Sequence, residues 1–239
     1  PKIRLVLGTT TPLDTVGLKG KDLIFQGLEK VRSVTGEDMA IMRFSIDGHQ
    51  DVIYDTNTPF DKLLMREELD IPFAIDRDMI DKVKDKIVGK TYYITTPIWY
   101  NSRSEKSEQG LRHVAVEIID VKPGTSVYPV KVIFKAGDVE EEHSVLMTIG
   151  NKRTSTRNFD TLFAFENPRV KYPLIKDETW ELIMHSKVKQ GMTKDECRLA
   201  LGTPDTWGQI PTNAGMVEYW SYSEGIYLLF EDGYLSRVR

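Results

Sequence analysis

The sequence is poor in the features that mark several large classes of protein. Its 239 residues include one cysteine, Cys197, so no disulfide can form within the chain and a hydrophobic core must hold the fold together. A chain of this length can bury such a core. No run of about 18 apolar residues occurs, so no segment is expected to cross a membrane. The net charge of −4 and the pI of about 5.7 argue against a nucleic-acid-binding surface.

Residues at the spacing of a catalytic or metal site are also scarce. The four histidines are His49, His113, His143 and His185. None stands at metal-binding spacing from a second type of ligand. The stretch 140–143, Glu-Glu-Glu-His, comes nearest, and we interpret it as the charged edge of a hairpin. Neither a glycine-rich phosphate loop nor a Gly-x-Ser-x-Gly motif is present. We therefore predict no catalytic residues, no metal and no cofactor.

The composition that remains is that of an ordinary globular protein, with 40% hydrophobic and 28% charged residues. The clearest local signal is a helix predicted over residues 194–201. The side chain of Thr193 can accept the backbone N–H of Glu196, and the Glu196 side chain can reach back to the N–H of Thr193, which makes a capping box. Gly202 and Pro204 end the helix. Its buried side is predicted to consist of Cys197, Ala200 and Leu201.

The first part of the chain, residues 1–75, has the pattern of a small β domain. Strands are expected around 23–25, 39–46 and 52–54, and Asp47-Gly48 is a strong hairpin-turn signal. A connecting helix is predicted over 76–87, with Asp76 as its cap.

A second β region follows over residues 88–168. Its strand candidates are 91–100, 114–121, 130–134 and 145–149, with an exposed loop at 101–110 and a closing segment at 163–165. Both β regions place Gly-Lys before a β run, at Gly20 and at Gly89, which indicates either an internal repeat or a chance match. By strand number and size, both regions resemble bacterial SH3-like barrels.

The composition changes after the proline-containing stretch 167–173, which marks a domain boundary. Asp177 is predicted to cap a helix, the helix at 194–201 follows, and strands are expected over 215–222, 226–230 and 234–238. The expected fold is therefore α+β and β-rich. Two small SH3-like barrels, over 1–75 and 88–168, precede a helix-helix-three-stranded antiparallel sheet module over 169–239.

This last module resembles the SmpA/OmlA lipoprotein family, whose members help to assemble proteins into the Gram-negative outer membrane. The matching stretches are 188–196 (VKQGMTKDE), 201–204 (LGTP), 219–222 (YWSY) and 229–235 (LFEDGYL). The same layout occurs in β-lactamase-inhibitor proteins. The resemblance implies a cell-envelope location, in the periplasm or attached to the outer membrane. The chain begins at Pro1 without a methionine or an apolar leader, which indicates processing or truncation and leaves room for a lipid anchor upstream.

Aromatic residues are the best candidates for a binding surface. The predicted C-terminal strands are apolar on both faces, so the face away from the helices should meet another domain, which we favour, or a partner. Trp207 is expected in a loop between Pro204 and Pro211, either tucked over the sheet or exposed as an anchor. Aromatic residues of the second β region could line a peptide groove. The candidate binding residues are Trp207, Trp220, Tyr222, Tyr92, Trp99 and Tyr100.

These observations favour a non-enzymatic binding or scaffold protein of the cell envelope, which would engage an unknown protein or cell-wall partner. One alternative is a hydrolase of cell-wall or surface polymers whose site is assembled from separate modules. Another is an inhibitor-like module that blocks a secreted enzyme. A flat, exposed aromatic face near Trp207 would favour the inhibitor.

Overall fold

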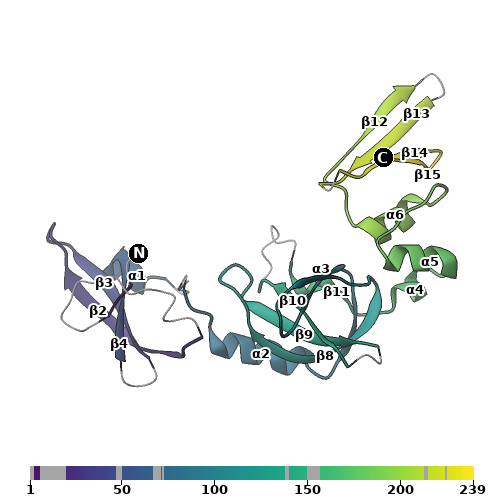
Figure 1. Ribbon diagram of the computed structural model, residues 1–239. Helices are drawn as coiled ribbons and strands as arrows, with labels where there is room; N and C mark the ends of the chain where they lie inside the picture. Colours follow the sequence, from purple (N-terminus) through teal and green to yellow (C-terminus); the bar gives the residue numbers. More distant parts are fainter. Residues whose placement is uncertain are drawn as a thin grey trace. The chain divides into compact units, whose positions relative to one another are not determined.

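The computed structural model describes residues 3–5, 20–46, 50–66, 71, 73–137, 140–149, 157–212, 215–223 and 225–239. These residues form an α+β protein rich in antiparallel strands (Figure 1), which confirms the expected fold class. The chain divides into two compact units, residues 1–74 and 75–239. Within the described residues, no helix has both the length and the apolar character needed to cross a membrane.

The first unit contains one four-stranded antiparallel sheet in the order β1-β4-β3-β2. Its elements are β1 (Ile3–Leu5), β2 (Leu23–Arg32), β3 (Asp38–Ile46), β4 (Gln50–Pro59) and the short helix α1 (Phe60–Leu64). The central strand β3 supplies most of the core, with Met42 and Phe44 almost fully buried. The predicted turn Asp47-Gly48 lies outside the described residues, but the pairing of Ile46 with Gln50 is that of a hairpin.

The second unit contains a seven-stranded sheet in the order β11-β5-β8-β9-β10-β6-β7. Its strands are β5 (Thr91–Ile94), β6 (Ile98–Asn101), β7 (Ser107–Gln109), β8 (Val114–Pro123), β9 (Val130–Ala136), β10 (Glu142–Met147) and β11 (Phe163–Ala164). The helices α2 (Arg77–Ile87) and α3 (Phe159–Leu162) accompany it. Neither this sheet nor any other in the described part of the chain closes on itself, so the predicted SH3-like barrels are not confirmed.

The connecting helix α2 forms as its sequence predicts. Asp76 caps it by accepting the backbone N–H of Asp78. Ile80 and Ile87 are buried in the core of the seven-stranded sheet, as the helical spacing of its apolar residues requires. On the polar side, Lys84 Nζ lies 2.6 Å from Asp120 of β8, which ties the helix to the sheet.

Two predictions in this region were wrong. The single strand expected over 91–100 is two strands, β5 and β6, which are not neighbours in the sheet. Pro97 separates them, since proline lacks the N–H that a continuous ladder needs. The exposed loop expected over 101–110 contains β7, which pairs with β6. The indole of Trp99 packs against Gly110 so closely that a Cβ there would overlap the ring, and this contact holds the returning strand in place.

The C-terminal part of the second unit combines helices with a four-stranded antiparallel sheet in the order β12-β13-β14-β15. Its elements are α4 (Pro168–Lys171), α5 (Asp177–Met184), α6 (Lys194–Leu201), β12 (Thr206–Thr212), β13 (Gly215–Ser221), β14 (Tyr227–Glu231) and β15 (Tyr234–Val238). The prediction of three strands missed β12, which occupies most of the expected loop. As an edge strand, β12 tolerates Pro211.

The predicted cap of α5 was also wrong. Lys176 occupies the cap position without a side-chain hydrogen bond, and Asp177 is the first helical residue. Asp177 instead accepts a hydrogen bond of 2.6 Å from Arg169 of α4. Its negative charge at the first turn still suits the positive end of the helix dipole.

The two regions of the second unit meet at Arg112 and His113, just before β8. The backbone N–H of Arg112 donates to the carbonyl of Met184, and its side chain donates to the Ser186 hydroxyl at 3.0 Å. His113 Nε2 lies 2.9 Å from the carbonyl oxygen of Leu199 in α6. Burial lowers the pKa of His113, with a smaller contribution from the charge of Arg112, so the imidazole is held neutral at this junction.

Helix α6 confirms its sequence signals at both ends. The Thr193 hydroxyl accepts the N–H of Glu196 at 3.3 Å, and Glu196 accepts the N–H of Thr193 at 2.7 Å. Cys197 and Ala200 are fully buried and Leu201 is half-buried, all in one hydrophobic core. Gly202 ends the helix with a φ of +87°, a conformation that glycine adopts without strain.

The capping box gives a first prediction. Thr193→Ala should lower the free energy of unfolding of the C-terminal part by about 1 kcal/mol, because the N–H of Glu196 loses its acceptor. Urea unfolding followed by Trp fluorescence measures the change. Thr203→Ala is the matched control, since Thr203 is exposed and makes no hydrogen bond within the described residues. Equal stability of the two variants would contradict the role assigned to the cap.

Candidate functional site

The two faces of the C-terminal sheet have different surroundings. Helices α5 and α6 lie on one side of it (Figure 1). The strand residues on that side are almost fully buried in a core with the helices: Trp220, Leu228, Phe230 and Leu235. The helices contribute Trp180, Ile183, Cys197 and Ala200 to the same core. This side of the sheet is therefore fully used for folding.

Charged side chains of α6 and β13 connect the helix to the sheet. Glu218 accepts a hydrogen bond from Lys194 Nζ at 2.6 Å and another from Trp220 Nε1 at 2.8 Å. The guanidinium of Arg198 lies over the Trp220 ring, 4.9 Å from its centroid. Burial alone would raise the pKa of Glu218, but the hydrogen bonds from Lys194 and Trp220 and the nearby positive charges lower it overall. The carboxylate is thus charged at neutral pH and holds α6 against β13.

The opposite side of the sheet, here called the outer face, carries apolar residues without a core. Its residues come from β12, β13 and β14 and share one side of the strands by register: Ile210, Val217, Tyr219, Tyr227 and Leu229. None of them belongs to a hydrophobic core of the described residues. The rings of Tyr219 and Tyr227 stack at 5.6 Å with an interplanar angle of 14°. Tyr219 lies across Gly208, where a side chain would clash with it.

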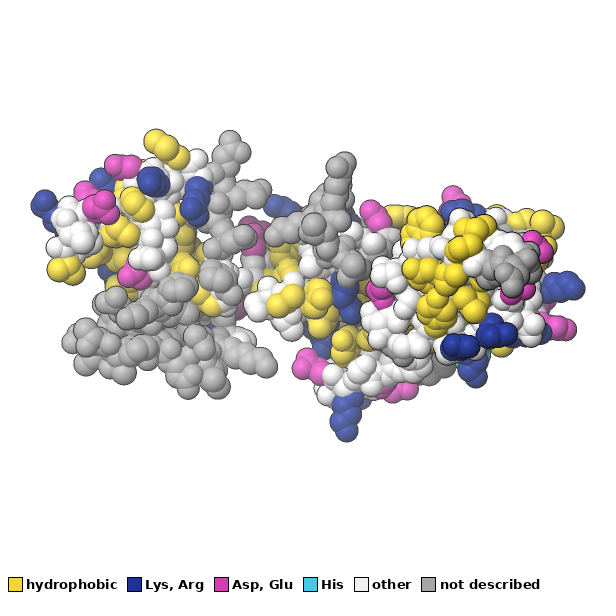
Figure 2. Space-filling model, turned by 90° about the horizontal axis from the view of Figure 1, so that it is seen from above, with side chains coloured by type: hydrophobic (Ala, Val, Ile, Leu, Met, Phe, Trp, Pro, Cys, Tyr) yellow, Lys and Arg dark blue, Asp and Glu magenta, His cyan; other side chains and the backbone are white. Residues whose placement is uncertain are grey.

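Trp207 lies at the edge of the same sheet. It pairs with Trp220 across β12 and β13, so it lies on the helix side of the sheet. Its side chain is 66% exposed, and Met216, near the tip of the same hairpin, is 57% exposed. Figure 2 shows hydrophobic side chains gathered at the surface of this C-terminal part. Of the two positions proposed for Trp207, the structure shows the exposed one, in a strand and not in a loop.

The other candidate binding residues are not exposed in this way. Trp220, Tyr92 and Trp99 are buried, and Tyr222 and Tyr100 are half-buried. The Tyr222 hydroxyl donates to the carbonyl of Gly202 at 3.2 Å, and burial raises its pKa to about 12. Trp99 donates its indole N–H to the carbonyl of Thr96. The six candidates therefore do not form one surface, and Trp207 alone among them presents a large exposed ring.

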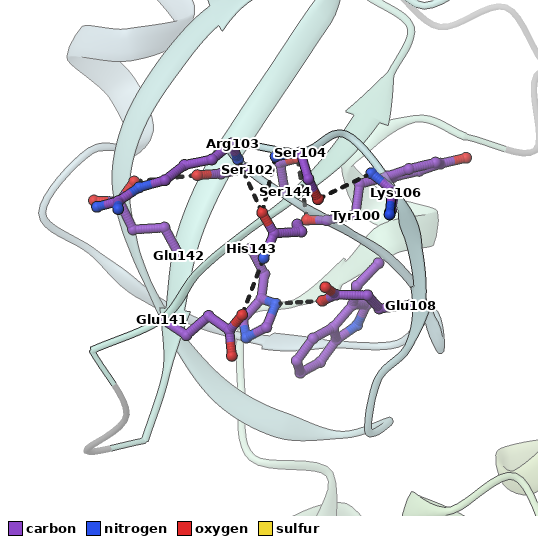
Figure 3. A network of polar contacts seen from close by, with 12 residues as sticks. Tyr100, Ser102, Arg103, Ser104, Lys106, Glu108, Glu141, Glu142, His143 and Ser144 are labelled. Carbon is purple, nitrogen blue, oxygen red and sulfur yellow. Dashed lines mark hydrogen bonds and ion pairs between the residues drawn. The ribbon is translucent and has the colours of Figure 1, made fainter.

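A polar network that includes a histidine lies beside Trp99 (Figure 3). His143 Nδ1 lies 3.0 Å from Glu108, and its ring lies 5.1 Å from Trp99. The Ser144 hydroxyl donates to the carbonyl of Tyr100. Within the described residues no hydroxyl or thiol hydrogen-bonds to His143, so the pair lacks the nucleophile–base contact of a covalent catalyst. We interpret it as a link between β10 and β7.

Other reactive groups also have structural explanations. Burial raises the pKa of Cys197 to about 12, so the thiol stays protonated. Asp38 and Asp61 line an open groove in the first unit, but each lies 3.9 Å from Lys30 and forms a surface ion pair. No group of three metal-ligating residues occurs among the described residues. His49 lies outside them.

Comparison with protein-family models, with curated proteins and with solved structures gave no match. The candidate site consists of the apolar outer face of the C-terminal sheet and, on the other side of the same sheet, the exposed Trp207 of the edge strand β12.

The charge on Glu218 gives a second prediction. Glu218→Gln should lower the free energy of unfolding by about 1 kcal/mol at pH 7, because the ion pair with Lys194 is lost. The pKa of Glu218 is lower in the folded state, so this contribution is present above the pKa of the unfolded chain and is lost as the pH falls through the folded value. Urea unfolding from neutral pH to about pH 3 should show the two proteins converging in acid. Glu231→Gln, an exposed change in the next strand, is the control.

Proposed function

We propose that this protein is a non-enzymatic binding or scaffold protein that holds a partner on the outer face and free edge of its C-terminal sheet. The observation that carries the proposal is the combination of an apolar outer face that belongs to no core with a tryptophan exposed at 66% on the adjoining edge strand. Large exposed apolar patches mark interaction sites, and tryptophan is over-represented among residues that dominate binding energy.

The edge strand itself supports a protein partner. β12 is at the end of the sheet order and leaves one row of backbone groups unpaired by any strand of the described residues. Its sequence, Thr-Trp-Gly-Gln-Ile-Pro-Thr, contains no charged residue. Monomeric proteins commonly protect such an edge with charges, bulges or covering elements. β15, at the other edge, carries Arg237. A partner strand added to β12 would satisfy the free backbone groups near its start, with Trp207 as its anchor.

The location proposed for this function is the cell envelope. It rests on the resemblance of the C-terminal stretches to the SmpA/OmlA family, whose helix-helix-sheet order agrees with α5, α6 and β13–β15. The same proposal includes a lipid anchor upstream of Pro1. It also includes a relationship of the two preceding β regions to SH3-like barrels. A cell-wall polymer is the other partner considered, since aromatic rings also bind sugars by stacking.

A second candidate is an inhibitor-like module that binds a secreted enzyme. The stacked pair Tyr219–Tyr227 favours it, because the rings give the outer face a flat aromatic area. This candidate uses the same surface and differs in the identity of the partner. The hydrolase alternative has less support, because His143 and the carboxylates of the first unit have the structural partners described above.

The third prediction tests this surface. Trp207 and Tyr227 are replaced one at a time by a photo-crosslinking phenylalanine analogue, and the protein is irradiated in envelope extract. A distinct crosslinked species is expected at both positions, and Trp207→Ala should weaken capture of that partner about tenfold or more. A secreted enzyme in the adduct would select the inhibitor-like role.

Leu174 provides the matched control. It is 95% exposed and lies outside the sheet, so the same analogue at this position should give no such adduct. Trp207 and not Trp220 is the position to mutate, because Trp220 is buried in the core of the module and its loss would disrupt folding. Equal crosslinking from positions 174, 207 and 227 would show nonspecific adhesion and refute the proposed surface.

A further inference from the structure

An aromatic groove lies on the seven-stranded sheet region, separate from the C-terminal sheet. Its volume is about 420 Å³, within the range of small-molecule sites. Residues from α2, from the start of β5 and from the segment around α3 and β11 line it: Val83, Lys86, Ile87, Lys90, Tyr92, Phe159 and Phe165. Most of this lining is apolar, so the groove suits a hydrocarbon chain.

Packed rings form one wall of the groove. Tyr92 contacts Phe159 edge to face at 5.0 Å and Phe165 at 5.7 Å, and Phe159 stacks on the buried Phe163 at 4.9 Å. Phe165 is nevertheless 65% exposed. A phenylalanine held against two rings while most of its surface meets water provides a ready apolar contact for a ligand.

Every polar side chain that lines the groove can donate a hydrogen bond to an anion. Lys86 and Lys90 flank the turn at Gly89, are exposed, and have no ion-pair partner within the described residues. The Tyr92 hydroxyl makes no hydrogen bond within the described residues, and burial raises its pKa, so it remains a donor. No carboxylate lines the groove. Two ammonium groups and a phenol around an apolar wall complement an apolar chain that ends in a carboxylate.

We infer that this groove binds a long-chain carboxylate of the fatty-acid class. The chain would lie along Phe159, Phe165 and Val83, and the carboxylate would accept hydrogen bonds from Lys86, Lys90 and Tyr92. A neutral lipid would leave both ammonium groups without a partner, and a cationic amphiphile would be repelled by them. The inference does not depend on the partner surface at Trp207.

The test is equilibrium binding of dansyl-labelled undecanoic acid, followed by its fluorescence, to the full chain. Binding is expected, with displacement by dodecanoate and about tenfold weaker displacement by its uncharged methyl ester. Lys86→Glu with Lys90→Glu should weaken dodecanoate binding about tenfold or more while leaving the methyl ester unchanged. Phe165→Ser should weaken both ligands. All three positions are exposed, so the variants are expected to fold, which circular dichroism checks.

Matched controls separate the groove from nonspecific binding and from the C-terminal surface. Lys187→Glu with Lys189→Glu makes the same charge change at exposed lysines outside the groove, and Leu174→Ser removes an apolar side chain that is more exposed than Phe165. Both should bind dodecanoate like the wild type, as should Trp207→Ala. Absence of probe binding to the wild type, or equal affinity in the groove variants and their controls, would overturn the inference.

Discussion

The organisation of the C-terminal part follows from one constraint: two helices of eight residues each must cover a four-stranded sheet. Short helices are marginal alone and depend on packing. Both therefore lie on the same side, where Trp220 provides the largest fully buried side chain. No helix remains for the outer face in the described residues. The fold therefore buries one apolar face of the sheet under the helices and leaves the other apolar face available to a partner.

The position of α6 determines which of its side chains contact the sheet. The capping box sets where the helix begins, and its phase then turns Cys197 and Ala200 inward. The same phase brings Lys194 to Glu218 and Arg198 over Trp220, so the polar side of the helix also contacts β13. A shift of α6 along the sheet would break the ion pair and the cation–π contact together, because both depend on the same position of the helix. Local capping therefore determines which side of α6 packs against the sheet.

Much of this architecture could be predicted because its signals are local. The caps of α2 and α6, and the turns around β13, β14 and β15, lie within a few residues of what they control. β12 was missed because Pro204, Gly208 and Pro211 indicate a loop, and only pairing with β13 makes the segment a strand. The exposure of Trp207 depends on that register. Likewise, Tyr92 meets Phe159 and Phe165 only through the distant pairing of β5 with β11.

The two surfaces of the second unit differ in what they would recognise. The groove around Tyr92 offers positive charge beside its apolar wall, so it can select a ligand by its anionic end. On the outer face, Arg237 of β15 lies opposite Leu229, whereas the adjoining edge strand β12 has no charge in its sequence. The β12 edge would select a partner by shape and by backbone pairing, which suits a protein strand better than a small anion. An uncharged open edge also pairs readily with wrong chains, so continuous occupation by a proper partner would protect the protein from aggregation.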